Sequence, residues 1–172
     1  MNSFTRPATP ADLDTIQEIF DAGKDYLKSQ GLPQWQDGHG PTIADTEPEI
    51  LAGQGHVLVV DGVVSGYTSL IPEPDGSPDL AEGAFDVGYG QYVAIHRVAL
   101  SPAVRGRGLS GGFMRDVLQA AREAGYRDIR IDTHPGNEIM QKVIMQMGFV
   151  YKGIMELDIP NGTRYAYQLV LD

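Results

Sequence analysis

The segment from 92 to 124 constrains the fold most, because a strand, a tight turn and a helix follow one another there without interruption. Strand-like residues run from Tyr89 to Leu100, and a turn with Gly106 and Gly108 comes next. Apolar residues then recur at the spacing of an amphipathic helix, which Gly125 ends. A strand joined in this way to an amphipathic helix predicts a protein of mixed α and β structure.

The glycine turn has the physical features of an anion site. Gly106 and Gly108 carry no side chain, so backbone N–H groups can meet a ligand directly. The turn opens into a helix, whose first N–H groups and positive dipole end attract negative charge. Arg105 and Arg107 add positive charge at the same place. We therefore expect a phosphate or pyrophosphate here, and a plain tight turn is the alternative interpretation.

Two well-known phosphate-binding motifs can be compared with the residue pattern of this turn. The Walker loop ends in Gly-Lys-Ser or Gly-Lys-Thr, and the chain contains neither string. The dinucleotide fingerprint requires three glycines after an early strand, and Gly106, Gly108 and Gly111 have its spacing. These glycines lie late in the chain and follow a hairpin region instead of opening a βαβ unit. A nucleotide such as NAD is therefore kept only as an alternative ligand.

The other elements follow from hydrophobic spacing and from residues that start or stop helices. Thr9 and Pro10 are typical of a helix start, and Asp61-Gly62 between two apolar runs is typical of a β-hairpin. Asn137 is the expected N-cap of the last helix. Strands are expected at 3–7, 57–60, 63–71, 89–100, 129–133, 149–159 and 164–171, and a short helix is expected at 46–53.

The order of these elements predicts the fold class. It is an α/β (α+β) arrangement with a mixed, mostly antiparallel sheet of about seven strands, flanked by four helices. Most strands are joined by hairpins, and neither a repeat nor a linker is visible. We therefore expect a single domain over 1–172.

Composition excludes several classes of protein. The chain of 172 residues has no cysteine, which excludes a disulfide scaffold, a cysteine zinc site, an iron–sulfur cluster and a thiol nucleophile. No window approaches the ~18 apolar residues of a membrane span. The first residues lack the apolar stretch of a signal peptide, so a cytoplasmic protein is expected.

Charge is distributed unevenly along the chain. The net charge is −10, which argues against non-specific nucleic-acid binding. The segment from Arg97 to Arg130, however, contains seven arginines and three acids, so it carries a charge of +4 and the rest of the chain carries −14. A local anionic ligand is one interpretation, and a solvated helix face accounts for some of these arginines.

The loop 72–88 carries five acids and no base. We interpret it as solvated, with attraction of a cationic amine as the alternative.

Several strings of the chain resemble one known family. The string from Val98 to Ser110, VALSPAVRGRGLS, is similar to motif A of the GNAT superfamily, the GCN5-related N-acetyltransferases. The strings RIDTHPGN, MQ, MGF and RYAY at 130–137, 140–141, 147–149 and 164–167 resemble a bacterial subgroup whose substrates are largely undefined, as do the N-terminal helix and the loop at 31–35. The resemblance covers nearly the whole chain and implies the GNAT fold.

The resemblance also implies a cofactor and its binding residues. The cofactor is acetyl-CoA, and the strand that carries Val98, Ala99 and Leu100 pairs with the pantetheine arm in the family. The family asparagine that contacts the same arm matches Asn137. The pyrophosphate is held by the turn, which here consists of Arg105, Gly106, Arg107, Gly108, Leu109 and Ser110.

Two positions depart from the family pattern. The glutamine or arginine that often precedes the first motif glycine by three residues is Ala103 here. Many members carry a tyrosine on the last helix that protonates the leaving thiolate, and the matching residue here is Ile144. Isoleucine cannot donate a proton, so another group must do so or the thiolate leaves without assistance.

The acceptor amine must be neutral to attack, so a base with a pKa near 7 is expected. His96, on the strand before the turn, is the first candidate, and serotonin N-acetyltransferase-like members place a histidine on the same strand. His134, after the strand at 129–133, is the second. Asp132 could orient either histidine. The alternatives are a histidine bound to backbone within the sheet, a turn-stabilising histidine, and an ion pair of Asp132 with Arg97 or Arg130.

The primary hypothesis is therefore an acetyl-CoA-dependent N-acetyltransferase. It would transfer the acetyl group directly to a primary amine of a small molecule or peptide, within a ternary complex, because no cysteine is present to form an acyl-enzyme. The alternative is a non-catalytic acyl-CoA-binding sensor or partner module. No metal, nucleic-acid or membrane partner is expected, and the resemblance leaves a homodimer open.

Overall fold

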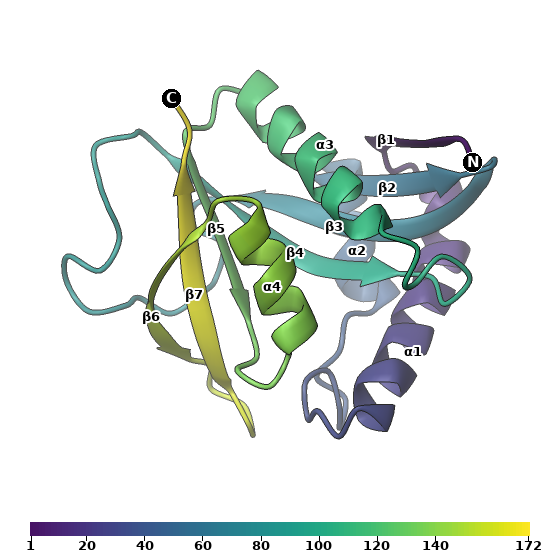
Figure 1. Ribbon diagram of the computed structural model, residues 1–172, viewed down its shortest axis with the longest axis horizontal. Coiled ribbons are helices and arrows are strands. Elements are labelled where there is room, and N and C mark those ends of the chain that lie inside the picture. The colour runs from purple at the N-terminus through teal and green to yellow at the C-terminus, as the bar shows by residue number, and fades with distance from the viewer.

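A seven-stranded sheet crosses the whole molecule in the computed structural model, which describes residues 1–172 (Figure 1). The strand order is β1-β2-β3-β4-β5-β7-β6, and only β4 and β5 are parallel neighbours. The strands are β1 (Ser3–Pro7), β2 (Gly55–Val60), β3 (Val63–Pro72), β4 (Tyr92–Leu100), β5 (Asp128–Thr133), β6 (Val150–Glu156) and β7 (Thr163–Val170). The helices are a 3-10 turn (Pro10–Asp12), α1 (Leu13–Ser29), α2 (Ile43–Leu51), α3 (Leu109–Glu123) and α4 (Glu138–Gln146).

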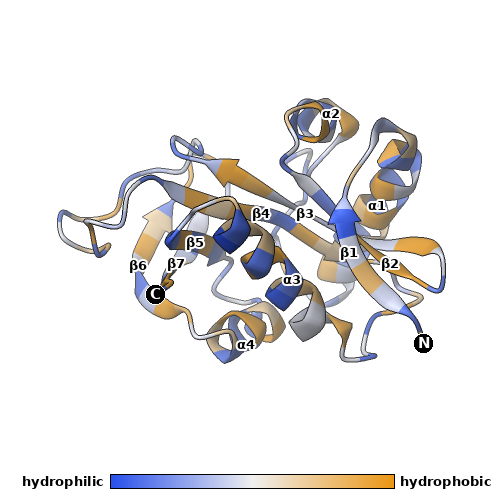
Figure 2. Cartoon of the chain, turned by 90° about the horizontal axis from the view of Figure 1, so that it is seen from above, coloured by the Kyte–Doolittle hydropathy of each residue, from blue (hydrophilic) through white to orange (hydrophobic).

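The helices cover the two faces of the sheet in pairs. Figure 2 shows α1 and α2 on one face of the sheet and α3 and α4 on the other. Each face has its own core. The larger core lies under α3 and α4 and includes Phe113, Met114, Ile129 and Ile144, and the smaller core lies under α1 and α2 around Phe20. The predicted fold class and element order are confirmed.

Local signals in the sequence explain where most elements begin. Thr9 and Asp12 form a capping box at the 3-10 turn that leads into α1, and the Asn137 side chain accepts a hydrogen bond from the Met140 N–H at the start of α4. Asp61 and Gly62 both have positive φ, 48° and 84°, as the tight hairpin between β2 and β3 requires.

Several elements differ by up to three residues from their predicted bounds; β4, for example, begins at Tyr92 and not at Tyr89, and β2 begins at Gly55 and not at Val57. Two of the differences have a clear local cause. The short helix begins at Ile43 and not at 46, because Thr42 and Asp45 form a capping box that starts it one turn earlier. The strand expected at 149–159 ends at Glu156, because the Leu157 N–H donates to the Gly162 carbonyl and closes the hairpin turn.

The divergence of β4 from β5 is the feature of the fold that positions the site. The two strands pair only from Tyr92–Asp128 to Ile95–Ile131. Two residues of β4, Arg97 and Val98, then face the single β3 residue Thr68, and Arg97 has φ 59°. This β-bulge bends β4 away from β5, so that the two halves of the sheet open like a V (Figure 1).

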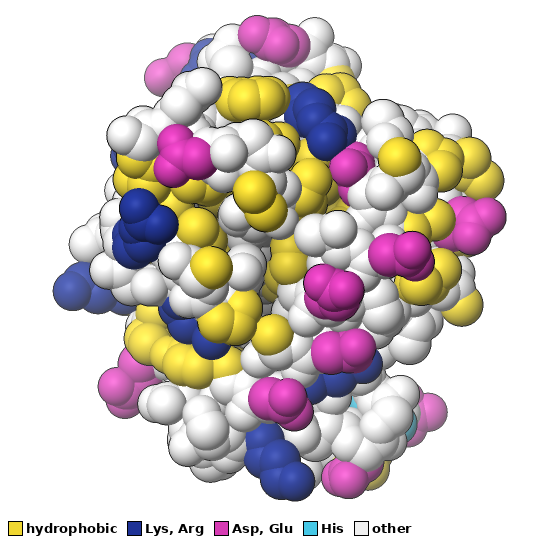
Figure 3. Space-filling model, turned by 90° about the vertical axis from the view of Figure 1, so that its right-hand side faces the viewer, with side chains coloured by type: hydrophobic (Ala, Val, Ile, Leu, Met, Phe, Trp, Pro, Cys, Tyr) yellow, Lys and Arg dark blue, Asp and Glu magenta, His cyan; other side chains and the backbone are white.

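The outer surface is mixed in character. On the side of the molecule shown in Figure 3, acidic side chains are scattered among Lys, Arg and hydrophobic groups and are not gathered in one place. None of the helices has the length and apolar character that crossing a membrane requires.

Candidate active site

The glycine turn forms a cradle of backbone N–H groups at the start of α3. Gly106 and Gly108 have φ 77° and 74°, and Gly108 is the N-cap of the helix. The N–H groups of both glycines have no hydrogen-bond partner within the chain. The first N–H groups of α3 also have no partner, as at any helix start without a side-chain cap. A Cβ added to either glycine would meet no heavy atom within 4 Å apart from those of its chain neighbours, so the turn is open at both positions. The cradle can therefore hold a phosphate or pyrophosphate.

The two arginines of the turn differ in what they contact. The Arg105 guanidinium donates to the Leu100 carbonyl at 3.1 Å and lies 4.1 Å above the centre of the Tyr26 ring, so it fastens the turn to α1. Arg107 is exposed and makes neither an ion pair nor a side-chain hydrogen bond. Arg107 is thus the guanidinium of the turn that is free to meet an anion.

The second half of β4 presents an open backbone edge toward β5. Ala99 and Leu100 pair with Tyr67 and Gly66 of β3 on one side, and no strand lies on the other. On the far side of the opening, at the end of β5, the Thr133 hydroxyl is buried and has no hydrogen-bond partner. A strand edge and an unpartnered hydroxyl suit an elongated ligand that carries amide groups.

Asn137 stands across this opening at the start of α4. Its side-chain oxygen caps the helix, and its Nδ2 donates to the Gln34 side-chain oxygen at 3.3 Å. Gln34 belongs to the α1–α2 connection, which Trp35 anchors by an edge-to-face contact with Phe20 at 6.1 Å. The connection therefore closes one side of the opening, and Trp35 is a packing residue.

His96 is held by a carboxylate that the sequence reasoning did not single out. Its Nε2 lies 2.8 Å from Asp75 Oδ2. Asp75 also accepts hydrogen bonds from the Ser77 hydroxyl at 2.6 Å and the Tyr92 hydroxyl at 2.7 Å. Burial alone would raise the pKa of Asp75, but the hydrogen bonds from His96, Ser77 and Tyr92 hold it well below its ordinary value.

The ionised Asp75 determines which nitrogen of His96 can act as a base. A carboxylate without a proton can only accept, so Nε2 carries the hydrogen, and in the neutral imidazole the free electron pair lies on Nδ1. No hydrogen bond within the chain engages Nδ1. Burial and the Asp75 charge raise the pKa of Tyr92 to about 12, so the tyrosine remains a donor to Asp75. Asp75 lies in the acidic 72–88 loop, and the loop's composition was the only signal for it.

His134 makes a different kind of contact. Its Nδ1 accepts a hydrogen bond from the Gly136 N–H at 3.0 Å, within the turn before α4. Burial lowers the pKa of His134, and the positive charge of Arg164 lowers it further. This geometry is that of the turn-stabilising histidine considered as the alternative.

Asp132 makes neither of the ion pairs considered for it. Arg97 pairs with Glu49 at 2.8 Å, and Arg130 pairs with Asp128 at 3.0 Å. The Asp132 carboxylate has no hydrogen bond within the chain. Burial raises its pKa above the ordinary value, and the charges of His96 and Arg164 act in the opposite direction. Asp132 therefore lies beside His96 as a carboxylate without a partner.

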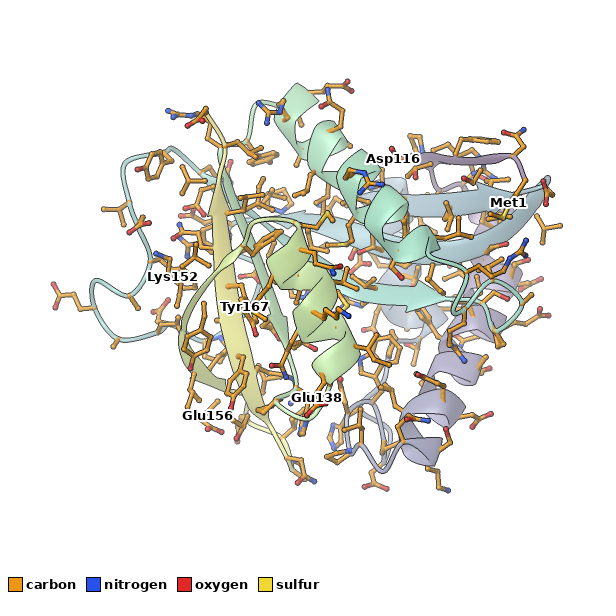
Figure 4. The ribbon with its side chains drawn as sticks, viewed as in Figure 1. Met1, Asp116, Glu138, Lys152, Glu156 and Tyr167 are labelled. Atoms are coloured by element: carbon orange, nitrogen blue, oxygen red, sulfur yellow. The ribbon has the colours of Figure 1, made fainter.

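A small cavity lies within the site, and the position that often carries a tyrosine in the family is a buried isoleucine. Asp75, Tyr92, Arg130 and Asp132 are among the residues that line a cavity of about 30 Å³ between the sheet and the connection after β3. Lys152 fixes the outer part of this connection through an ion pair with Asp86 at 3.0 Å (Figure 4). Ile144 is fully buried in the larger core, so its position offers no proton donor.

Comparisons with known proteins show the family and agree with the fold. The profile of the acetyltransferase (GNAT) family matches residues 17–149. A GNAT-family acetyltransferase structure from Streptococcus agalactiae 2603 is 28% identical, with a TM-score of 0.85 over 99% of this chain and 96% of that one. One from Listeria monocytogenes 4b F2365 is 24% identical, with a TM-score of 0.73 over 98% and 95%. The yncA protein of Salmonella typhimurium, solved with its cofactor acetyl-CoA, is 23% identical, with a TM-score of 0.69 over 100% and 95%. A search of curated proteins finds no match.

Proposed function

The chain belongs to the GNAT family of acetyltransferases, and from this premise we propose that it transfers the acetyl group of acetyl-CoA to a primary amine. The observation that carries the proposal is the order of two features along the chain: the unpaired edge of β4, which begins after His96, is followed directly by the N–H cradle at Gly106 and Gly108. An amide-bearing arm and a phosphate group require these two features in this order.

The residues of these two features fit acetyl-CoA. The N–H groups from Gly106 to Ser110 would bind the pyrophosphate, with Arg107 as a second source of positive charge. The open edge at Val98, Ala99 and Leu100 would pair with the pantetheine amides, and Asn137, which caps α4, would contact the same arm. The buried Thr133 hydroxyl, which has no partner in the chain, supports a polar occupant of the opening between β4 and β5.

Acetyl-CoA supplies an acetyl thioester, and the chain supplies position and proton transfer. His96 Nδ1 would take a proton from the cationic amine and pass it to solvent. The neutral nitrogen then forms the C–N bond as the C–S bond breaks, and its second proton ends on the sulfur. Asp75 holds the imidazole in the required tautomer. N–H groups at the open edge of β4 can polarise the thioester carbonyl.

The assignment of His96 and not His134 rests on the free nitrogen. His134 uses Nδ1 to accept from Gly136 and carries its proton on Nε2, so it has no free electron pair to offer. We therefore propose His96 as the base and His134 as a residue that shapes the turn before α4.

The test is steady-state acetylation of a broad amine panel by the wild type, His96→Ala and His39→Ala. His39 lies exposed on the α1–α2 connection and is the matched control. We expect a fall of about 10²–10⁴-fold in kcat for His96→Ala, with unchanged acetyl-CoA affinity, and no change for His39→Ala. Tight acetyl-CoA binding without turnover by the wild type would refute the enzyme and support the non-catalytic module. An unchanged kcat in His96→Ala would refute only the proposed role of His96 as the base and would leave the acetyl transfer standing.

A further inference from the structure

Three charged or titratable residues form a row across the open part of the sheet. Asp132 of β5 is paired with Ala166 of β7, and Arg164 lies two residues before Ala166 on the same face. On the other side, pairing between β4 and β5 stops at Ile95 and Ile131, so His96 and Asp132 are the first residues beyond it on their strands. The row therefore runs from His96 through Asp132 to Arg164, on the face of the sheet opposite α3 and α4.

Arg164 is a buried guanidinium that the chain satisfies only in part. The residue is 5% exposed, and its Nη1 donates to the carbonyls of Asn161 and Thr163 at 2.9 Å. Nε and Nη2 have no hydrogen-bond partner within the chain, and no carboxylate lies within ion-pair distance. Neither nitrogen is fully buried, so both remain accessible to a ligand. Burial lowers the pKa of Arg164, whereas the charges of Asp132 and Glu156 raise it. A buried arginine normally has an anion opposite its remaining N–H groups.

The neighbouring acids are either occupied or too distant to be this anion. Glu156, labelled in Figure 4 at the lower end of β6, accepts from the Thr163 hydroxyl at 3.0 Å. Asp75 is occupied by three donors. Asp132 and Arg164 are diagonal neighbours on adjacent strands, for which the separation of the side-chain bases is about 7–8 Å. They sense each other's charge without forming an ion pair.

A carboxylate and a guanidinium that are held apart in this way suit a ligand with both charges. An α-amino acid carries its ammonium and carboxylate on one carbon, so it can span the two groups with one hydrogen-bonded contact at each end. A simple amine would leave Arg164 unpaired, and a simple acid would leave Asp132 unpaired. Each of these mismatches costs affinity, because the bound ligand removes water from a charged group and gives it no partner.

We propose that the acceptor is an α-amino acid, with its carboxylate on Arg164 and its amino group between Asp132 and His96. The inference rests on the proposed acetyl transfer and names the substrate class of the same site. In this arrangement Asp132 holds the ammonium until His96 takes its proton. Arg164 fixes the other end of the molecule and is a specificity-determining residue.

The experiment compares three acceptors that share one side chain: an α-amino acid, its carboxamide and its decarboxylated amine. Initial rates with each are measured for the wild type, Arg164→Gln and Asp132→Asn, after a panel of side chains has identified the best acid. We expect the wild type to prefer the acid by about 10–100-fold in kcat/KM, which corresponds to about 1.5–3 kcal/mol for a charged hydrogen bond. Arg164→Gln should lose this preference by slowing the acid alone, and Asp132→Asn should slow all three.

Two further measurements separate recognition from a structural role. Arg164→Lys keeps the charge without the two-pronged donor and should restore only part of the preference. Calorimetry should find that the N-acetylated acid binds about 10–100-fold more tightly than its N-acetylated carboxamide to the wild type, and equally to Arg164→Gln.

The outcomes distinguish this inference from the proposal beneath it. Equal rates for acid and amine in the wild type, or an Arg164→Gln defect that is the same for all three acceptors, would overturn the amino-acid assignment and leave acetyl transfer standing. Failure of the wild type to acetylate any amine in the panel would instead overturn the proposed function.

Discussion

Substitution of Gly108 by alanine should affect two properties that can be measured separately, the stability of the fold and the affinity of the turn for acetyl-CoA. Gly108 has φ 74° at the start of α3, and Gly125 has φ 93° just after its end. Both positions have open space where a Cβ would be added. Strain in the left-handed region is therefore the shared cost, and only Gly108 lies in the N–H cradle. Gly125→Ala is thus a matched control on the same helix.

The expected loss of stability is similar for the two variants. A side chain in the left-handed region costs about 1–2 kcal/mol. For a chain of 172 residues, each kcal/mol shifts Tm by about 2–4 °C. Both variants should therefore unfold about 2–8 °C below the wild type when no ligand is present.

The expected loss of binding differs between them. Acetyl-CoA at about 100 times its Kd should stabilise the wild type by about 2.7 kcal/mol, a rise of about 5–11 °C in Tm. Misdirecting one N–H that donates to a phosphate weakens binding by about 1.5–3 kcal/mol, or about 10–100-fold. At the same ligand concentration, Gly108→Ala should then gain only about 0.4–1.4 kcal/mol, or about 1–6 °C.

The assay is thermal unfolding of the wild type, Gly108→Ala and Gly125→Ala, with and without acetyl-CoA, and with NAD as a second ligand. Gly125→Ala should keep the full rise with acetyl-CoA. A full rise in Gly108→Ala, or an equal loss in both variants, would show that the cradle does not bind the pyrophosphate. A rise with NAD alone would assign the turn to a dinucleotide.

Three further predictions concern the unliganded protein. Tyr67→Phe should lower the free energy of unfolding by about 1–3 kcal/mol in urea titrations, because the buried Tyr67 hydroxyl donates to Glu49 at 3.0 Å and the carboxylate would lose that donor; an unchanged midpoint would contradict this. Thr133→Val should leave Tm unchanged or raise it, because the hydroxyl it removes is buried without a partner, and a clear fall would reveal a missed hydrogen bond. The folded pKa of Asp75 lies below its unfolded value of about 3.9, so the unfolded chain alone takes up that proton and stability should fall as the pH drops below about 4. The urea midpoint should fall less steeply for Asp75→Asn than for the wild type as the pH is lowered from neutral to acidic. Equal slopes in the two proteins would show that Asp75 does not cause the loss of stability.

Much of the fold could be predicted because its signals are local. The Asp61-Gly62 hairpin, the Asn137 cap and the glycine end of α3 each depend on a few adjacent residues. The signal for the early start of α2 was equally local, since Thr42 and Asp45 form its capping box, but the predicted helix began at 46. The lengths of the last strands depend on pairing between segments and were less predictable.

The environment of His96 was only partly predictable from the sequence. His96 could be singled out by its place before the glycine turn, but its partner Asp75 lies 21 positions earlier in a loop without regular structure. Nothing in the spacing indicates that the loop folds back onto β4. For the same reason the sequence left an ion pair of Asp132 with Arg97 or Arg130 as an alternative interpretation, whereas those arginines pair with Glu49 and Asp128.

The sequence by itself determined the elements, their order, the absence of thiol chemistry and the glycine cradle, because each of these depends on neighbouring residues or on composition. Tertiary structure alone decided which charges meet. The β-bulge at Arg97 opens β4 from β5, and strand pairing sets Asp132 and Arg164 on one face without contact. Electrostatic partners act through distance in space, and that distance follows from register and packing between segments far apart in the chain.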